Sequence, residues 1–172
     1  MNNPENIFIS SAVISKIRFD IISSPIGLRK IIINNKQLIS NYKNATKLRN
    51  DDPYTFDIFI QLEEYFESKR KKFEISIDIQ GTEFQLKVWN EILKIQWGET
   101  KSYEQIAEKA GGKNTIRAVG RTVGLNPLPI VIPCHRVIGK NGKLTGYSGG
   151  LEVKEKLLRL EGSISLELFE QE

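Results

Sequence analysis

The side chains best suited to covalent chemistry stand next to each other in this sequence. Its one cysteine, Cys134, and its one histidine, His135, are adjacent, with a proline before them and an arginine after them. A thiol of ordinary pKa is only about 3% ionised at neutral pH, so a nucleophilic cysteine needs a base or a positive neighbour. His135 is the available base. The pair indicates a reactive thiol, whereas many lone cysteines are simply small buried hydrophobic residues.

Three prolines shape the backbone around this pair. They exclude a helix over residues 126–138, and the apolar run 130–132 predicts a short extended segment. Neighbouring side chains of an extended segment point to opposite faces, so contact between Cys134 and His135 needs a bend or a bridging water. A carboxylate on the far imidazole nitrogen would complete a relay, and Glu161 is our candidate for it.

A basic stretch without carboxylates surrounds the pair. No Asp or Glu lies between Glu108 and Glu152, although the chain has 21 of them and a net charge of +4. Such a stretch favours a polyanionic partner over a merely solvated basic face. The basic residues of this window are Lys109, Lys113, Arg117, Arg121, Arg136, Lys140 and Lys143.

Composition narrows the class of protein. Hydrophobic residues make up 40% and charged residues 27%, as in ordinary globular proteins. No apolar run reaches the roughly 18 residues of a membrane helix, and the N-terminus is too polar for a secretory signal, so we expect a cytoplasmic protein. One cysteine and one histidine are too few for a typical zinc site, so we expect neither a metal nor a cofactor.

The N-terminal half reads as strands followed by a helix. β-Branched and polar residues alternate over the first ~50 residues, for example over 13–19, and another strand is predicted over 28–33. Asp52 as N-cap and Pro53 at the first helical position predict an amphipathic helix over 53–69. A further strand is predicted over 73–79, and Gly81 marks a domain boundary.

The sequence after Gly81 is helical in character. Thr82 and Ser102 each begin a capping box, the second opening a short helix that ends at Gly111-Gly112. Asn114 then caps a helix over 115–124, which completes a helix-turn-helix pattern. The buried stripe predicted for the first of these helices is Phe84, Val88, Trp89, Ile92 and Leu93.

The last part of the chain reads as a turn and a final helix. Residues 140–143 form a turn that suits the tip of a wing. The final helix ends at Glu161-Gly162, and its predicted inward residues are Val153, Leu157 and Leu160.

An ordered set of motifs gives the chain a family resemblance. Residues 133–138, Pro-Cys-His-Arg-Val-Ile, resemble the signature of O6-alkylguanine-DNA alkyltransferases, also called methylated-DNA–protein-cysteine methyltransferases. The resemblance covers about residues 82–162, while the N-terminal half is similar only in general character. The other matching motifs are Ser102-Tyr103, Arg117-Ala118-Val119-Gly120, Asn126-Pro127, Pro129, Gly146-Tyr147-Ser148-Gly149-Gly150 and Leu160-Glu161-Gly162.

The resemblance implies an α+β fold in two domains. Residues 1–80 would form an N-terminal α/β domain, a small antiparallel sheet with a helix in an α/β roll. Residues 81–172 would form the DNA-binding and alkyl-acceptor domain, which is helical and resembles a winged helix-turn-helix. We expect a monomer whose partner is double-stranded DNA containing O6-alkylguanine, with no cofactor and no membrane.

The resemblance also implies catalytic roles. Cys134 would accept the alkyl group irreversibly, with His135 deprotonating it through a water and Glu161 orienting the imidazole. Asn126 would hold the active-site turn together, and Tyr103 would donate a hydrogen to guanine N3. The residues implied to line the pocket are Val137, Tyr147, Ser148 near O6, and Gly149.

DNA recognition is implied through the minor groove, with the damaged base flipped out of the duplex. Arg117 would fill the space that the base leaves, and Ala118 and Gly120 would permit close approach of the helix backbone. Tight helix–helix packing is the other explanation for these small residues. The remaining residues implied to contact DNA are Ser102, Arg121 and Arg136, although Arg121-Thr122 stands where many members carry small residues.

Two other functions are open at this stage. A non-catalytic winged-helix protein that binds DNA or flags lesions would explain the basic window, but lesion-flagging relatives lack the acceptor cysteine. A Cys-His hydrolase would explain the thiol, but it would need an oxyanion hole and would leave the basic window unexplained.

Overall fold

The computed structural model describes residues 6–35, 40–42, 44–49, 52 and 55–164. The chain divides into two compact units, Met1–Ile79 and Gln80–Glu172. This division lies one residue from the boundary proposed above, between 80 and 81. None of the helices in the described ranges is long and apolar enough to cross a bilayer.

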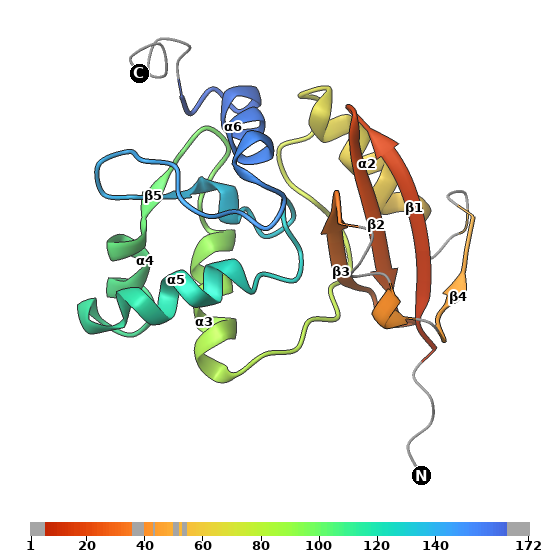
Figure 1. Cartoon of the computed structure of the whole chain (residues 1–172), viewed down its shortest axis with the longest axis horizontal. Coiled ribbons are helices and arrows are strands. Elements are labelled where there is room, and N and C mark those ends of the chain that lie inside the picture. Colours follow the sequence, from red (N-terminus) through yellow and green to blue (C-terminus); the bar gives the residue numbers. More distant parts are fainter. Residues whose placement is uncertain (1–5, 36–39, 43, 50–51, 53–54, 165–172) are drawn as a thin grey trace. The chain divides into compact units, whose positions relative to one another are not determined.

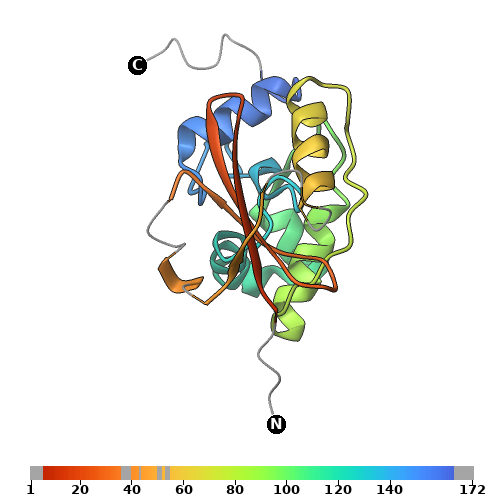
Figure 2. The same ribbon diagram turned by 90° about the vertical axis from the view of Figure 1, so that its right-hand side faces the viewer.

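The first unit is built on a four-stranded sheet with the order β3-β2-β1-β4. The first three strands form an antiparallel meander, whereas β4 pairs with β1 in parallel, so the sheet is mixed rather than purely antiparallel. Figures 1 and 2 show helix α2 beside this sheet. The elements are β1 (Phe8–Ile14), β2 (Ile17–Ser23), β3 (Leu28–Ile33), η1 (Ser40–Tyr42), β4 (Thr46–Lys47) and α2 (Phe56–Phe66).

Apolar packing joins α2 to the sheet. The rings of Phe19 on β2 and Phe66 on α2 lie 5.9 Å apart, and Phe19 is fully buried. The inward face of α2 repeats at helical spacing, with Ile58, Leu62 and Tyr65 all buried. Thr55 at the N-cap makes no side-chain hydrogen bond to the helix. Burial of the apolar face, rather than capping, therefore holds α2 in place.

The structure locates one turn of this unit and corrects the start of its helix. The alternating stretch 13–19 is a hairpin, in which Ser15 and Lys16 form a two-residue turn with φ angles of 51° and 65°. The sequence hides this turn because neither residue is the usual Gly or Asn. Helix α2 begins at Phe56 rather than 53, and its N-cap is Thr55 rather than Asp52. Pro53 lies outside the described residues.

The predicted strand over 73–79 is also wrong. Only an isolated bridge between Leu28 and Ile77 forms there. The Leu28 amide donates to the Ser76 carbonyl at 2.8 Å, and the Asp78 amide donates to the Leu28 carbonyl at 2.8 Å. The strand over 28–33 is confirmed as β3.

The second unit packs three helices, α3, α4 and α5, against one another (Figure 1). Both predicted capping boxes are present, at Thr82 and at Ser102. Trp89 of α3 is buried and donates its indole N–H to the Thr122 carbonyl of α5 at 3.1 Å. The elements are α3 (Glu83–Leu93), β5 (Lys101–Ser102), α4 (Tyr103–Ala110), η2 (Lys113–Thr115), α5 (Ile116–Gly124), η3 (Cys134–Arg136), β6 (Val137–Ile138) and α6 (Leu151–Leu160).

The helix-turn-helix is confirmed as α4, a turn and α5. Two predictions for the helices of this unit, one N-cap and one buried residue, are wrong. The N-cap of α5 is Thr115 rather than Asn114, because the 3-10 turn η2 comes first. Leu93, predicted to be buried in α3, is 41% exposed. β5 pairs with β6 in parallel, and the predicted turn at 140–143 is closed by a hydrogen bond from the Gly139 amide to the Lys143 carbonyl at 2.9 Å.

Helix α6 buries a different set of residues from the predicted one. Val153 and Leu157 are buried as expected, but Leu158 takes the place of Leu160. Lys154 is buried as well, with none of its surface exposed. This helix brings Glu161, just after its last residue, to the segment that contains the cysteine.

Candidate active site

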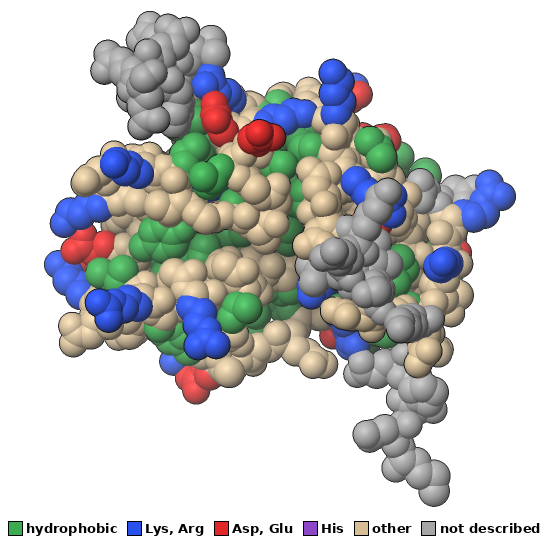
Figure 3. All heavy atoms as spheres, viewed as in Figure 1, with side chains coloured by type: hydrophobic (Ala, Val, Ile, Leu, Met, Phe, Trp, Pro, Cys, Tyr) green, Lys and Arg blue, Asp and Glu red, His purple; other side chains and the backbone are tan. Residues whose placement is uncertain are grey.

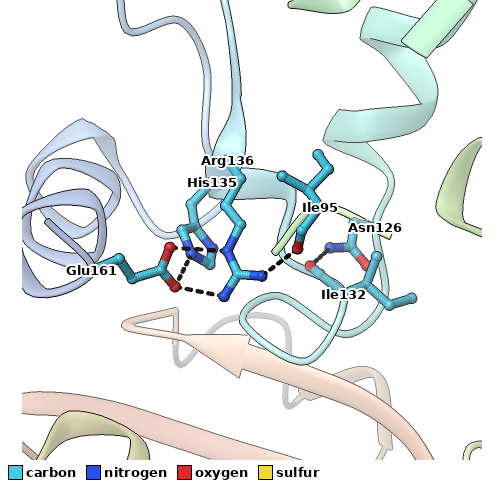
Figure 4. Close-up of polar contacts among 6 residues, drawn as sticks. All are labelled: Ile95, Asn126, Ile132, His135, Arg136 and Glu161. Atoms are coloured by element: carbon cyan, nitrogen blue, oxygen red, sulfur yellow. Dashed lines mark hydrogen bonds and ion pairs between the residues drawn. The ribbon is translucent and has the colours of Figure 1, made fainter. Parts of the chain in front are cut away.

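Cys134 begins a one-turn 3-10 helix, η3, that follows Pro133 and leads into β6. The side chain of Asn126 closes this segment. Its Nδ2 donates to the Ile132 carbonyl at 2.8 Å and to Cys134 Sγ at 2.9 Å, and its Oδ1 accepts from the Leu128 amide at 3.0 Å. Figure 4 shows the bond to Ile132. One buried amide thus hydrogen-bonds both to the loop backbone and to the sulfur.

The backbone here departs from the predicted extended segment. Ile130 has a φ of +78°, a left-handed conformation that is rare for a β-branched residue, and it is 1% exposed. The 3-10 turn at 134–136 supplies the bend that the sequence argument required. The prolines exclude an α-helix, as expected, but they do not exclude this single tight turn.

His135 and Arg136 both point at Glu161 (Figure 4). His135 Nε2 lies 2.9 Å from Glu161 Oε1, and both side chains are fully buried. Arg136 Nε donates to Oε2 at 2.9 Å and Nη2 donates to Oε1 at 2.7 Å, forming a bidentate pair. Arg136 Nη1 also donates to the Ile95 carbonyl at 2.6 Å.

The role predicted for Arg136 is therefore wrong. Its side chain is 6% exposed, and its guanidinium is committed to Glu161 and a backbone carbonyl. It braces the carboxylate inside the protein and does not face DNA. The candidate relay residue Glu161, in contrast, lies where the sequence argument placed it, on the imidazole.

Burial dominates the ionisation of this cluster. Burial raises the pKa of the Cys134 thiol to about 11, although the Asn126 hydrogen bond and the Lys154 charge act in the opposite direction. Burial also lowers the pKa of His135, so its imidazole is neutral at physiological pH. Burial opposes ionisation of Glu161 as well, but hydrogen bonds from His135 and Arg136 outweigh it and lower the pKa of that carboxyl to about 2.

These protonation states fix the imidazole tautomer. Ionised Glu161 can only accept hydrogen bonds, so His135 Nε2 must carry the hydrogen and donate it. The other ring nitrogen, Nδ1, is then the basic one. The arrangement is that of a carboxylate–imidazole pair oriented to take a proton.

A cavity of about 880 Å³ opens between α4, α5 and the loop that follows β6. Figure 3 shows apolar side chains gathered between α5 and that loop, with lysine and arginine side chains around them. Of the predicted pocket residues, Tyr147 and Ser148 line this cavity, whereas Gly149 and the fully buried Val137 do not. The lining residues are Tyr103, Glu104, Ile116, Gly120, Val123, Gly124, Lys140, Thr145, Gly146, Tyr147 and Ser148.

Two contacts cross this cavity from the loop to α4. Thr145 Oγ1 donates to Tyr103 Oη at 3.2 Å, which leaves the phenolic hydrogen available to a ligand. Lys140 Nζ lies 3.0 Å from Glu104 Oε2. The ring of Tyr147, which lines the cavity, has its centroid 6.4 Å from that of His135. Tyr147 therefore lies between the cavity and the buried His135.

Helix α5 presents small and basic residues to solvent. Arg117, Ala118 and Arg121 are exposed, and neither arginine makes an ion pair with any residue in the described part of the chain. A Cβ atom added to Gly120 would meet nothing within 4 Å. Packing inside the protein therefore does not explain glycine at 120. Ser102 is half-buried and caps α4 through its hydroxyl.

Lys154 is the residue that sequence reasoning missed. It follows Val153 in the predicted inward stripe of α6, and nothing in the sequence distinguishes it from a solvated lysine. Its Nζ donates to the carbonyls of Val137 at 2.7 Å and Thr145 at 2.9 Å.

Among the described residues, no three side chains of His, Cys, Asp or Glu converge as a metal site.

Comparison with known proteins places this fold and site in a class of DNA-repair proteins. The model of the 6-O-methylguanine DNA methyltransferase DNA-binding domain matches residues 83–163, which include the helix-turn-helix, the cysteine turn and α6. The structure is similar to a crystal structure of the Mycobacterium tuberculosis O6-methylguanine methyltransferase, with a TM-score of 0.83 and 34% identity, covering 91% of this chain and 93% of that one.

Two further relatives extend the likeness along the chain. A methylated-DNA–protein-cysteine methyltransferase from Bacillus subtilis, described as inducible, is 40% identical over 172 residues, 96% of each chain. The structure of M. tuberculosis OGT in complex with DNA has a TM-score of 0.82 at 35% identity, covering 91% of this chain and 93% of that one. The chain belongs to the methylated-DNA–protein-cysteine methyltransferase family.

Proposed function

We propose that this protein repairs O6-alkylguanine in duplex DNA by transferring the alkyl group to Cys134, once and irreversibly. The observation that carries this proposal is the environment of the sulfur. Cys134 is buried at a turn fixed by Asn126, and the next residue, His135, is a neutral imidazole that Glu161 holds by its Nε2–H. The relatives named above, and the DNA bound in the OGT structure, support the same activity.

Proton transfer comes first in the proposed reaction. The thiol with its raised pKa is a poor nucleophile, so His135 takes the proton from Sγ through a bridging water. Glu161 stabilises the imidazolium that results, because it is ionised and lies 2.9 Å from Nε2. In this relay the thiolate forms only when His135 takes the proton within the site. The resting thiol stays protonated and is therefore protected from stray electrophiles.

Alkyl transfer follows as a displacement at carbon. The thiolate forms the S–C bond as the C–O6 bond breaks, and the electron pair of that bond stays on guanine. Guanine takes a proton at N3 from Tyr103 Oη, which can donate because it accepts from Thr145. Tyr103 regains a proton from solvent, and the His135 imidazolium releases to solvent the proton that it took from the thiol. A thioether is a poor leaving group, so the protein is consumed.

We assign the delivery of the base to helix α5 and the cavity. Exposed Arg121 would neutralise a phosphate, and Ala118 and Gly120 would let the helix backbone approach the minor groove. Arg117 would occupy the space left by the flipped base. Tyr147 and Ser148 would contact the base in the cavity. Such a reaction needs no cofactor and one copy of the chain, and the cytoplasm is the expected location.

The alternative is a winged-helix protein that binds or flags lesions without chemistry. It would use the same α5 surface, but it would not need the Asn126–Cys134 and His135–Glu161 contacts. Intact mass separates the two functions. Incubation with O6-benzylguanine as a free base should add one benzyl group per protein, and Cys134→Ala should add none. Folded, reduced protein that gains no mass would support lesion binding instead.

A further inference from the structure

The most unusual buried group outside the proposed relay is the amine of Lys154. Lysine side chains are almost never fully buried unless they are paired. This one has none of its surface exposed, and its two hydrogen-bond acceptors are the backbone carbonyls of Val137 and Thr145, at 2.7 and 2.9 Å. Val137 follows the cysteine turn, and Thr145 lines the cavity. The amine therefore ties the cysteine segment to the wall of the base pocket.

The formal charges of the cluster give this amine a second role. Arg136 and Glu161 neutralise each other in a bidentate pair, and His135 is neutral. Lys154 makes no ion pair with a carboxylate among the described residues, so the buried cluster carries a charge of +1 while Cys134 is a thiol. Ionisation of Cys134 brings that sum to zero. A buried charge without a counter-ion is costly, so this imbalance favours the thiolate.

We propose that Lys154 is the counter-ion of the Cys134 thiolate, a positioning residue that stabilises the nucleophile while it holds the pocket wall against the cysteine segment. This proposal rests on the alkyl-transfer function above for its purpose, but the pairing of the two side chains can be measured without any substrate. The two carbonyls hold the Lys154 amine in place before the thiolate forms. The surrounding groups therefore need not reorganise when the negative charge develops on the sulfur.

The electrostatics of the two groups agree with this pairing. Burial lowers the pKa of the Lys154 amine to about 8, and the Cys134 charge acts to raise it. Reciprocally, the Lys154 charge acts to lower the pKa of Cys134. The other titratable or charged groups of the cluster are His135, Arg136 and Glu161, and Lys154 also lowers the pKa of His135. Once the sulfur is alkylated it can no longer balance the amine.

The reactivity of the thiol in the full-length protein tests the proposal at about pH 7, where the Lys154 amine is still charged. Lys154→Met removes the charge and keeps the length of the side chain, whereas Lys154→Arg keeps the charge. The rate at which iodoacetamide alkylates Cys134, followed by intact mass with Cys134→Ser as blank, reports the fraction of thiolate. We expect the Met variant to react about tenfold more slowly than wild type, which corresponds to about tenfold less thiolate. The Arg variant should react at a rate closer to that of wild type.

A purely structural clamp predicts a different result. Loss of the two carbonyl contacts alone would lower thermal stability but leave the alkylation rate of the folded Met variant unchanged, and that outcome would overturn the proposal. The pH dependence of the rate provides a second measurement. In wild type the rate should rise less steeply above about pH 8, where the Lys154 amine loses its charge, whereas in Lys154→Arg it should keep rising. Identical pH profiles for these two proteins would also overturn the proposal, and neither measurement depends on alkyl transfer from guanine.

Discussion

At the scale of single residues, Cys134 lies in an environment that holds it unreactive until it is needed. Burial raises the pKa of its thiol to about 11, so the resting sulfur is protonated at physiological pH. In the proposed reaction His135, which Glu161 holds through Nε2, takes the proton from the sulfur. A protein that is consumed by one reaction benefits from this protection, because stray electrophiles react with thiolates rather than with thiols.

Glu161 should make the free energy of unfolding depend on pH in the acid range. Its carboxyl has a pKa lowered to about 2 from the ordinary 4.5, so its ionised form stabilises the folded state above pH 4.5. That contribution, about 3 kcal/mol, is lost as the pH falls from about 4.5 toward 2. Urea unfolding across this range should show the loss in wild type, and Glu161→Gln should lack this component of the pH dependence.

A matched control is Glu155→Gln, which breaks the i,i+4 pair with Arg159 at the protein surface. Surface pairs contribute only about 0.5 kcal/mol, so this variant should retain the acid dependence of wild type. Parallel pH curves for wild type and Glu161→Gln would contradict the role of Glu161 as the buried ionised partner of His135 and Arg136.

At the scale of elements, helix α5 has a composition that internal packing does not explain. Glycine inside a helix costs about 1 kcal/mol relative to alanine, and Gly120 has open space where a Cβ would stand. Gly120→Ala should therefore raise the free energy of unfolding by roughly 0.5–1 kcal/mol. If the helix backbone approaches DNA at this point, the same variant should bind duplex DNA more weakly.

The reciprocal variant is Ala118→Gly, which removes a methyl group from the exposed face of the same helix. It should lose a similar amount of stability and keep its affinity for duplex DNA. Thermal unfolding and fluorescence anisotropy with a labelled duplex measure the two quantities. DNA affinity that follows helix stability in both variants would refute the close-approach argument.

Local signals explain which elements the sequence predicted. The capping boxes at Thr82 and Ser102 join residues only three positions apart, so they can be read from the sequence, and α3 and α4 begin where they indicate. The hairpin turn at Ser15-Lys16 carries no such signal, because tertiary pairing of β1 with β2 imposes its positive φ angles. The left-handed Ile130 is likewise fixed by its surroundings.

Long-range partners explain what sequence reasoning missed in the site. The cysteine, the histidine and Glu161 came from residue types and spacing, and the structure brings them together. The resemblance placed Arg136 at DNA. Its bonds to Glu161 and Ile95 could not be foreseen, because they depend on the packing of α6 and α3. Lys154 was missed for the same reason, since its burial follows from the positions of the Val137 carbonyl in β6 and the Thr145 carbonyl in the loop after it.

At the scale of the whole molecule, the basic window is less uniform than the sequence indicates. Within it, Lys113 pairs with Glu108 and Lys140 pairs with Glu104, both acids of α4. Arg136 is buried, so among the described residues the arginines of α5 are the guanidinium groups of this window that remain exposed. The net charge of +4 should attract DNA generally, and the exposed arginines of α5 are the contact that we propose for it.

Arg117→Ala should separate base flipping from chemistry. Its reaction with duplex O6-methylguanine should slow on the order of tenfold or more, equivalent to about 1.4 kcal/mol. Its reaction with free O6-benzylguanine should change little, because a free base needs no flipping. Lys16→Gln, which removes one exposed positive charge from the other unit, should leave both reactions near wild type at moderate salt. Equal losses on the two substrates would count against the proposed role of Arg117.

The most direct measurement of the central claim is the fate of a labelled methyl group. A duplex carrying one O6-methylguanine with an isotopic methyl is supplied in excess, and the protein and DNA are analysed by mass spectrometry at completion. We predict one labelled methyl per protein, located on Cys134, an equal amount of restored guanine, and no transfer by Cys134→Ser. Restoration of more guanine than protein, or a methyl group on any other residue, would contradict the account.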